Sequence, residues 1–237
     1  MRFLRMRNRQ PELMDQPGLS EVEHSAALAA LGRVNFLSFS VARLWTALRS
    51  LAASDLAQRP LVVLDLACGG GDIAIGLASR ARRRKIPLTI HGCDFSPTAV
   101  RIANEASQRS GLADLKFFRL DVLKEPLPLG YDVIMCSLFL HHLDQGDAQR
   151  LITGMAAAAR RAVLIDDLLR TAFGYALCGV GCRILTRSRI VQTDGPRSVK
   201  AAYSLDEVRG LVAQCGLQRA RIKRHWPERF LLTWERL

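Results

Sequence analysis

Apolar residues along this chain fall into two patterns: short continuous runs, and longer stretches in which they recur every three or four positions. Continuous runs are typical of strands buried on both faces, and they predict strands at residues 61–66, 88–93, 115–120, 131–136 and 162–165. Helical spacing predicts helices between them, at about residues 71–81, 96–109 and 146–159. Strands that alternate with helices form a parallel sheet through right-handed crossovers. The pattern therefore predicts an α/β fold with a doubly wound sheet.

The chain after this core has different patterns. Residues 168–185 are apolar and contain glycines, and the segment is too short to span a membrane. A basic linker follows, and residues 193–196, which read Thr-Asp-Gly-Pro, predict a turn. Residues 204–207 form a capping box for a helix that runs to residue 215. Two last strands, at residues 218–223 and 230–234, predict an antiparallel hairpin.

The chain before the core has helical spacing throughout residues 10–54. We therefore expect residues 1–54 to form a helical N-terminal arm, followed by one domain at residues 55–237. The alternative for any single residue of this arm is a plain packing extension.

Polar residues stand at the ends of the predicted parallel strands. Residues 65–71, Asp-Leu-Ala-Cys-Gly-Gly-Gly, join the first strand to a helix, and glycines let such a turn approach a ligand closely. Asp94 ends the second strand and Asp121 follows the third. Because open α/β sheets bind ligands at the carboxyl edge of their strands, we expect a ligand site there.

These motifs make residues 55–237 resemble the class I S-adenosylmethionine-dependent methyltransferases, whose first motif is Asp/Glu-x-Gly-x-Gly-x-Gly. Ala67 is the one departure from that motif. The resemblance implies a Rossmann-like, seven-stranded and mainly parallel sheet with an antiparallel last strand, and S-adenosylmethionine as the cofactor. It implies that the cofactor-binding residues are Asp65, Ala67, Gly69, Gly71, Asp94, Phe95, Asp121, Val122 and Cys136.

The same resemblance implies a role for most of these residues. Asp65 organises the turn and meets the amine of the cofactor, and Asp94 binds the ribose hydroxyls. Gly69 and Gly71 pass under the methionine part, which Cys136 also touches, and the pair after the third strand contacts the adenine.

The resemblance also implies which segments cover the site. The N-terminal arm folds over the cofactor, and residues 168–200 form a substrate-covering insertion. We expect Asp167 and Tyr175 to bind substrate.

From the composition we expect a soluble, intracellular protein. Apolar residues make up 49% of the 237 residues, yet no run is long enough to cross a bilayer and no secretory leader is evident. We expect a cytoplasmic location and reduced thiols at all six cysteines. Cys178 and Cys182 share a helix face, but no further ligands stand near them in sequence, so we expect no metal site.

The net charge of +12 raises the question of an anionic partner. One basic run, residues 80–85, lies where cations favour a helix C-terminus. The other, residues 1–9, mixes arginine with Phe, Leu and Met and suits contact with a membrane surface at least as well as RNA. We expect a small hydrophobic substrate and no specific nucleic acid, and the oligomeric state stays open.

Two histidines follow the fourth strand, within Leu140-His141-His142-Leu143. This place lacks the Asn-Pro-Pro-Tyr or Asp-Pro-Pro-Tyr motif associated with methylation of adenine amines. In small-molecule O-methyltransferases a histidine that resembles His141 deprotonates a phenol, which needs a base because its pKa is near 10. His141, and after it His142, are therefore the candidate catalytic residues, and the alternative is a structural feature of a helix start.

Residues 11–15, 166–170 and 194–198 also resemble a bacterial subgroup associated with type III polyketide synthases and with phenolic-lipid or quinone biosynthesis. The favoured hypothesis is O-methylation of a phenolic polyketide or phenolic lipid. C-methylation in quinone biosynthesis is the first alternative. RNA methylation rests on the charge alone, and a cofactor-binding scaffold without catalysis is the last alternative.

Overall fold

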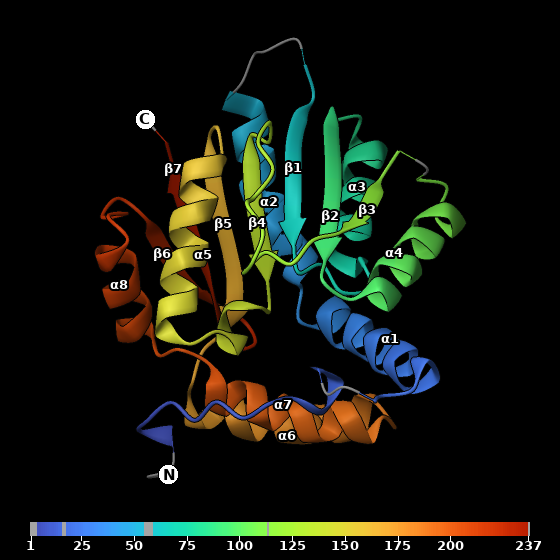
Figure 1. Cartoon of the computed structure of the whole chain (residues 1–237), viewed down its shortest axis with the longest axis vertical. Coiled ribbons are helices and arrows are strands. Elements are labelled where there is room, and N and C mark those ends of the chain that lie inside the picture. Colours follow the sequence, from blue (N-terminus) through green and yellow to red (C-terminus); the bar gives the residue numbers. More distant parts are fainter. Residues whose placement is uncertain (1–3, 16–17, 55–58, 113, 237) are drawn as a thin grey trace.

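The computed structural model describes residues 4–15, 18–54, 59–112 and 114–236. Its centre is one sheet of seven strands in the order β3-β2-β1-β4-β5-β7-β6 (Figure 1). The strands are β1 (Leu61–Leu66), β2 (Leu88–Asp94), β3 (Lys116–Arg119), β4 (Val133–Ser137), β5 (Ala162–Leu168), β6 (Arg221–His225) and β7 (Arg229–Glu235). β7 runs antiparallel to both of its neighbours, and the pairs among β1 to β5 are parallel. The expected seven-stranded, mainly parallel sheet is confirmed.

Helices cover both faces of this sheet. On one face lie α2 (Ser40–Ser54), α3 (Asp72–Arg84) and α4 (Pro97–Arg109), and on the other α5 (Gln145–Ala158) and α8 (Leu205–Gln214). Successive residues of a strand point to opposite faces, and along β4 Met135 packs with the first group while Ile134 and Cys136 pack with the second. The sheet is therefore buried on both sides, as the continuous apolar runs predict.

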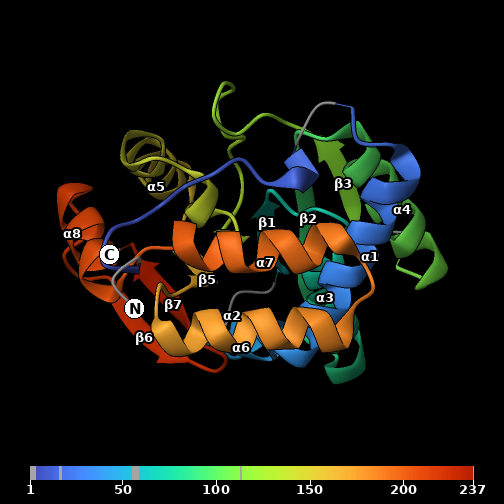
Figure 2. The ribbon, with the colours of Figure 1, turned by 90° about the horizontal axis from the view of Figure 1, so that it is seen from below.

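The carboxyl edge of the sheet is covered by elements from both ends of the sequence. Figures 1 and 2 show α6 (Ala172–Leu185) and α7 (Arg189–Ala201) side by side below this edge, with α1 (Glu21–Leu37) next to them. A short 3-10 helix, Leu13–Asp15, packs on α7, and the preceding segment is tied to α7 where the Asn8 N–H donates to the Lys200 carbonyl at 3.0 Å. The predicted boundary between residues 54 and 55 adjoins residues 55–58, which lie outside the described part.

The predicted turn at residues 193–196 is wrong. The segment after residue 188, interpreted as a linker and a turn, is the helix α7, with Pro196 inside it. A glycine stands inside this helix because α7 packs closely against α6. A Cβ at Gly195 would lie 2.7 Å from the Cys182 Sγ and 3.0 Å from the Cys178 Sγ. The Asp194 carboxylate accepts hydrogen bonds from the backbone N–H groups of Leu13 and Met14, at 2.9 and 3.0 Å.

Replacing Gly195 with alanine is therefore expected to lower the free energy of unfolding by about 1–3 kcal/mol, because the new methyl group forces α6 and α7 apart. Gly210→Ala in α8 is the matched control, since nothing lies within 4 Å of a Cβ there. It should raise the free energy of unfolding by about 0.5–1 kcal/mol through backbone entropy. Chemical denaturation measures both, and equal effects of the two substitutions would contradict the close helix contact.

None of the helices in the described part is, taken singly, long and apolar enough to cross a membrane. The pair Glu21–Leu37 and Ser40–Ala53, bent by 64°, passes such a test by length and composition alone. Ala172–Leu185 is apolar but shorter.

Candidate active site

A cavity of about 700 Å³ lies at the carboxyl edge of the sheet. It adjoins β1 where the chain crosses over to β2 on one side and to β4 on the other, which is the topological switch point at which such sheets bind ligands. α1 and the segment around Glu12 form the opposite wall. Among the residues expected at the site, those that line the cavity are Asp65, Ala67, Gly69, Asp94, Phe95, Asp121, Val122 and His142.

The turn between β1 and α3 needs left-handed backbone at three positions. Ala67, Gly69 and Gly71 have φ angles of 51°, 53° and 76°. A Cβ at Gly71 would lie 2.7 Å from the Phe117 ring, so glycine here serves packing against β3. Gly69 faces the cavity instead. The turn is thus held tight from behind while its backbone is presented to a ligand.

Asp94 joins this turn to the next one. Its buried carboxylate accepts the Gly69 N–H at 2.9 Å and the Ser96 N–H at 2.9 Å. Each carboxylate oxygen can accept more than one hydrogen bond. Asp94 therefore remains able to receive hydroxyl donors from the cavity while it fixes the two loops.

Buried carboxylates gather beside the same turn. Burial, together with the charges of Asp72 and Asp94, raises the pKa of Asp65 well above its usual value. Burial also raises the pKa of Asp72, although the Asn35 amide of α1 donates to that carboxylate at 3.1 Å. Crowded buried carboxylates are stabilised by a cation. This part of the cavity fits a ligand with a positively charged amine.

Asp121 lies further along the same wall. Its carboxylate is 2.9 Å from the Lys124 ammonium, and this contact is the main cause of its lowered pKa. Val122 follows it and also lines the cavity.

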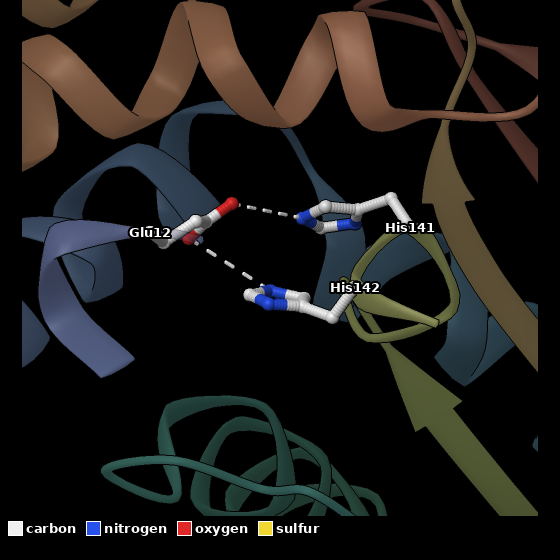
Figure 3. Close-up of side chains that lie close together, drawn as sticks. All are labelled: Glu12, His141 and His142. Atoms are coloured by element: carbon white, nitrogen blue, oxygen red, sulfur yellow. Dashed lines mark ion pairs between the residues drawn. The ribbon is translucent and has the colours of Figure 1, made fainter. Parts of the chain in front are cut away.

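Glu12, His141 and His142 meet at the other end of the cavity (Figure 3). The two imidazoles are 4.4 Å apart between ring centroids and both face the Glu12 carboxylate. Glu12 lies 3.6 Å from the His141 Nε2 and 3.8 Å from the His142 Nε2. Glu12 and His142 line the cavity, whereas His141 is buried behind them.

Two carboxylates flank the His141 imidazole. Its Nδ1 is 2.7 Å from an oxygen of Asp167, whose other oxygen accepts the His141 backbone N–H at 3.1 Å. Burial acts to lower the pKa of His141, but Asp167 and Glu12 outweigh it and raise that pKa to about 10. Burial acts to raise the pKa of Glu12, but the histidines outweigh it and lower that pKa to about 2. The ion-paired arrangement thus favours the protonated form of His141, and its role as a base stays a prediction.

The basic N-terminal segment positions Glu12. The Arg7 and Arg9 guanidinium groups donate to the backbone carbonyls of His141 and His142, each at 2.8 Å. The Ser198 hydroxyl of α7 donates to the Glu12 carboxylate. Part of the basic run at residues 1–9 thus serves contacts within the chain, while residues 1–3 lie outside the described part.

Several expected site residues lie away from the cavity. Cys136 is fully buried in the core, because the alternation of β4 turns it toward α5 and α8, and Ser137 lines the cavity instead. Asp167 is a partner of His141, as described above. Tyr175 lies on α6 outside the cavity lining, with the Lys200 ammonium 5.3 Å from its ring centroid. The substrate-binding roles expected of Asp167 and Tyr175 stay predictions.

Comparison with known proteins supports this interpretation of the cavity. Residues 63–162 match the model of a family described as a methyltransferase domain, and this region holds the glycine turn and the ends of β1 to β4. Magnesium protoporphyrin IX methyltransferase from Synechocystis, solved with bound SAH, has the same fold, with a TM-score of 0.60 over 94% of this chain and 90% of that one at 18% identity. Residues 63–162 thus match a methyltransferase domain, and the comparisons support a class I S-adenosylmethionine-dependent methyltransferase.

Relatives with named activities match about half of the chain. A demethylmenaquinone methyltransferase of Deinococcus radiodurans is 36% identical over 102 residues, which is 43% of this chain and 39% of that protein. A ubiquinone biosynthesis O-methyltransferase of Azoarcus is 27% identical over 124 residues, 52% of this chain and 51% of that protein. This chain thus aligns with about half or less of the length of these relatives. The methyltransferase fold and its S-adenosylmethionine cofactor are shared, and the acceptor is a separate question.

Glu12, Asn35 and Asp72 line the cavity and were not predicted from the sequence. Asp72 had a signal, since it directly follows the glycine turn at the start of a helix. Glu12 lies in a segment noted only for a family resemblance, and Asn35 is one polar residue in a helical arm. Their approach to the site depends on how the arm folds back.

Proposed function

We propose that the protein transfers the methyl group of S-adenosylmethionine to a hydroxyl oxygen of an apolar phenolic acceptor. The observation that carries the proposal is the single cavity that joins the acidic Asp65 end to the Glu12 and His142 end. Between these ends the cavity has apolar walls, formed by Met14, Leu19, Leu28, Leu31, Leu138 and Phe139. An apolar aromatic acceptor matches this lining.

One group of residues binds the cofactor in this proposal, and another activates the acceptor. S-adenosylmethionine, when bound, supplies an electrophilic methyl group next to the carboxyl edge of the sheet. Asp65 and Asp94 hold the cationic and hydroxyl-bearing parts of that cofactor. His142 can activate the acceptor hydroxyl by taking its proton, and Glu12 and His142 together can do so through a cation that they hold.

The acceptor class follows from the lining and from the relatives. The resemblance to the subgroup associated with polyketides and phenolic lipids supports a phenol with an alkyl chain, and the ubiquinone biosynthesis O-methyltransferase supports an O-linked product. The similarity to a demethylmenaquinone methyltransferase favours a second candidate, C-methylation of a quinone precursor. Both acceptors are apolar rings that carry hydroxyl groups, and they differ in the atom that receives the methyl group.

The test is product analysis with S-adenosylmethionine that carries a labelled methyl group. We expect alkylated phenols, catechols and hydroquinones to be converted to methyl ethers, with kcat/KM rising as the alkyl chain lengthens, because each buried methylene adds about 0.8 kcal/mol. Label found on a ring carbon would establish the second candidate instead. Transfer to folded RNA but to none of these rings would overturn both.

We also propose that the partner of this protein is a small molecule and not a nucleic acid. The internal bonds of Arg7 and Arg9 support this, because they engage basic residues that would otherwise be available to phosphates. Contact of the remaining N-terminal residues with a membrane surface stays a proposal, which the exposed Met6 supports.

A further inference from the structure

We propose that Glu12, His141 and His142 form a binding site for one divalent transition-metal ion, of the Zn²⁺ or Fe²⁺ type. One carboxylate oxygen and two imidazole nitrogens lie within 4.8 Å of one another, the one such cluster found in the described part of the chain. Two histidines and one carboxylate are the ligand set of catalytic zinc sites and of non-haem iron sites.

The spacing suits a small ion. Metal-to-ligand distances near 2.1 Å place the ligand atoms of a tetrahedral or octahedral site about 3.0–3.4 Å apart. The separations of 3.6 and 3.8 Å join different oxygens of the Glu12 carboxylate to the Nε2 atoms of His141 and His142, and one ligand atom from each residue lies within 4.8 Å of the others, so the cluster is wider than a loaded site. Glu12 comes from a segment outside the sheet and its helices, so a shift of that segment together with rotation of the His142 side chain can close the cluster around an ion.

The surroundings of His141 are those of a metal ligand. Histidines that bind metals generally donate their other ring N–H to a carboxylate, which fixes the tautomer and the orientation of the ring. Asp167 does this here, with its oxygen 2.7 Å from the His141 Nδ1. The Nε2 is then directed at Glu12, as Figure 3 shows.

Charge and access also agree with an ion at this place. Glu12 and Asp167 bring two negative charges to the buried His141. A divalent ion that binds the His141 Nε2 displaces the proton of that nitrogen into solvent and balances both charges. Glu12 and His142 line the cavity, so an acceptor oxygen or water can reach the remaining coordination positions. The role of the ion rests on the proposed function: it would bind the acceptor oxygen and lower the pKa of that hydroxyl. The existence of the site rests on the three side chains alone.

The test measures metal binding without an acceptor. Tag-free full-length protein is stripped with a chelator, and Zn²⁺ and Co²⁺ are added separately. We expect one ion per chain, a visible absorption band for the Co²⁺ form, and a melting temperature that rises with free metal because the ion binds the folded state. No binding of either ion at about 100 μM free metal would overturn the proposal. That result would mean a binding free energy weaker than about −5.5 kcal/mol.

Variants separate this site from adventitious binding. Glu12→Gln and His142→Ala should each weaken binding by at least about 10-fold, and Asp167→Asn by about 10- to 100-fold through the orientation of His141. His91→Ala removes an imidazole that lies outside the cavity lining and should bind metal like the parent. Equal affinities for Glu12→Gln, His142→Ala and the parent would overturn the proposal, whatever happens to Asp167→Asn.

Activity then distinguishes the two proposals. Metal bound as described but no methyl ether formed would defeat the proposed function and leave the metal site. A chelated protein that forms methyl ethers at the full rate would show that the ion has no role in transfer.

Discussion

Replacing Asp65 with asparagine is expected to weaken S-adenosylmethionine binding by about 100-fold, because the loss of one partner of a buried charge pair costs about 2–5 kcal/mol. The Asp65 carboxylate is 1% exposed, at the base of the cavity, beside the glycine turn. Titration calorimetry of the two proteins measures the difference. An unchanged dissociation constant would remove Asp65 from the cofactor site.

The same substitution has a predictable dependence on pH. The raised pKa of Asp65 means that the folded protein holds this proton more tightly than the unfolded chain does. Its contribution to the stability of the cofactor-free protein is therefore fully present below the unfolded pKa, about 3.9, and is lost as the pH rises through the folded value. Cofactor affinity should rise with pH over the same interval, because the amine needs the ionised carboxylate.

Asp65→Asn should remove both the fall in stability and the rise in cofactor affinity with pH. At pH values above the folded pKa of Asp65, the cofactor-free variant should be more stable than the parent. Asp206→Asn is the control. Asp206 lies exposed on α8, and its replacement changes the net charge by the same amount as Asp65→Asn does. Unfolding and calorimetry at a series of pH values test the pair of variants. Persistence of the two pH trends in Asp65→Asn would assign them to another group, with Asp72 the next candidate.

Replacing Glu12 with glutamine is expected to lower kcat for methyl transfer by about 100-fold or more, since activation of a hydroxyl contributes at least that factor. The dissociation constant of S-adenosylmethionine should change by less than about 2-fold, because an interaction made only in the transition state does not affect ground-state binding. His142→Ala should behave in the same way. Steady-state rates and calorimetry give the two quantities.

His91→Asn is the matched control for these variants, since it changes a histidine of β2 that bonds to the Tyr131 hydroxyl outside the cavity lining. Its kcat should stay close to that of the parent. Full activity of both Glu12→Gln and His142→Ala would leave proximity and orientation as the sources of catalysis. The cluster would then be a structural link between the N-terminal segment and the sheet.

The positions of the strands and of the acids at their ends followed from local pattern. An apolar run of strand length, bounded by glycine or aspartate and followed by helical spacing, leaves few alternatives to a β-α unit. For this reason Asp65 and Asp94 were predicted at the carboxyl edge of the sheet, and the structure places both on the cavity. The α7 helix was missed because Gly195 and Pro196 favour a turn locally, whereas packing against α6 requires glycine and holds the helix.

The sequence by itself determined the class of this protein, because the order of strands and helices and the glycine turn are local features that many contacts then reinforce. Only the tertiary structure decided which further groups line the cavity. Alternation along β4 buries Cys136. The N-terminal segment folds back over the sheet edge, where Arg7 and Arg9 bond to the backbone carbonyls of the two histidines. This brings Glu12 to His141 and His142. Such approaches between distant segments leave no periodic signal in the sequence, since they depend on side chains that meet only after the sheet and its helices have packed.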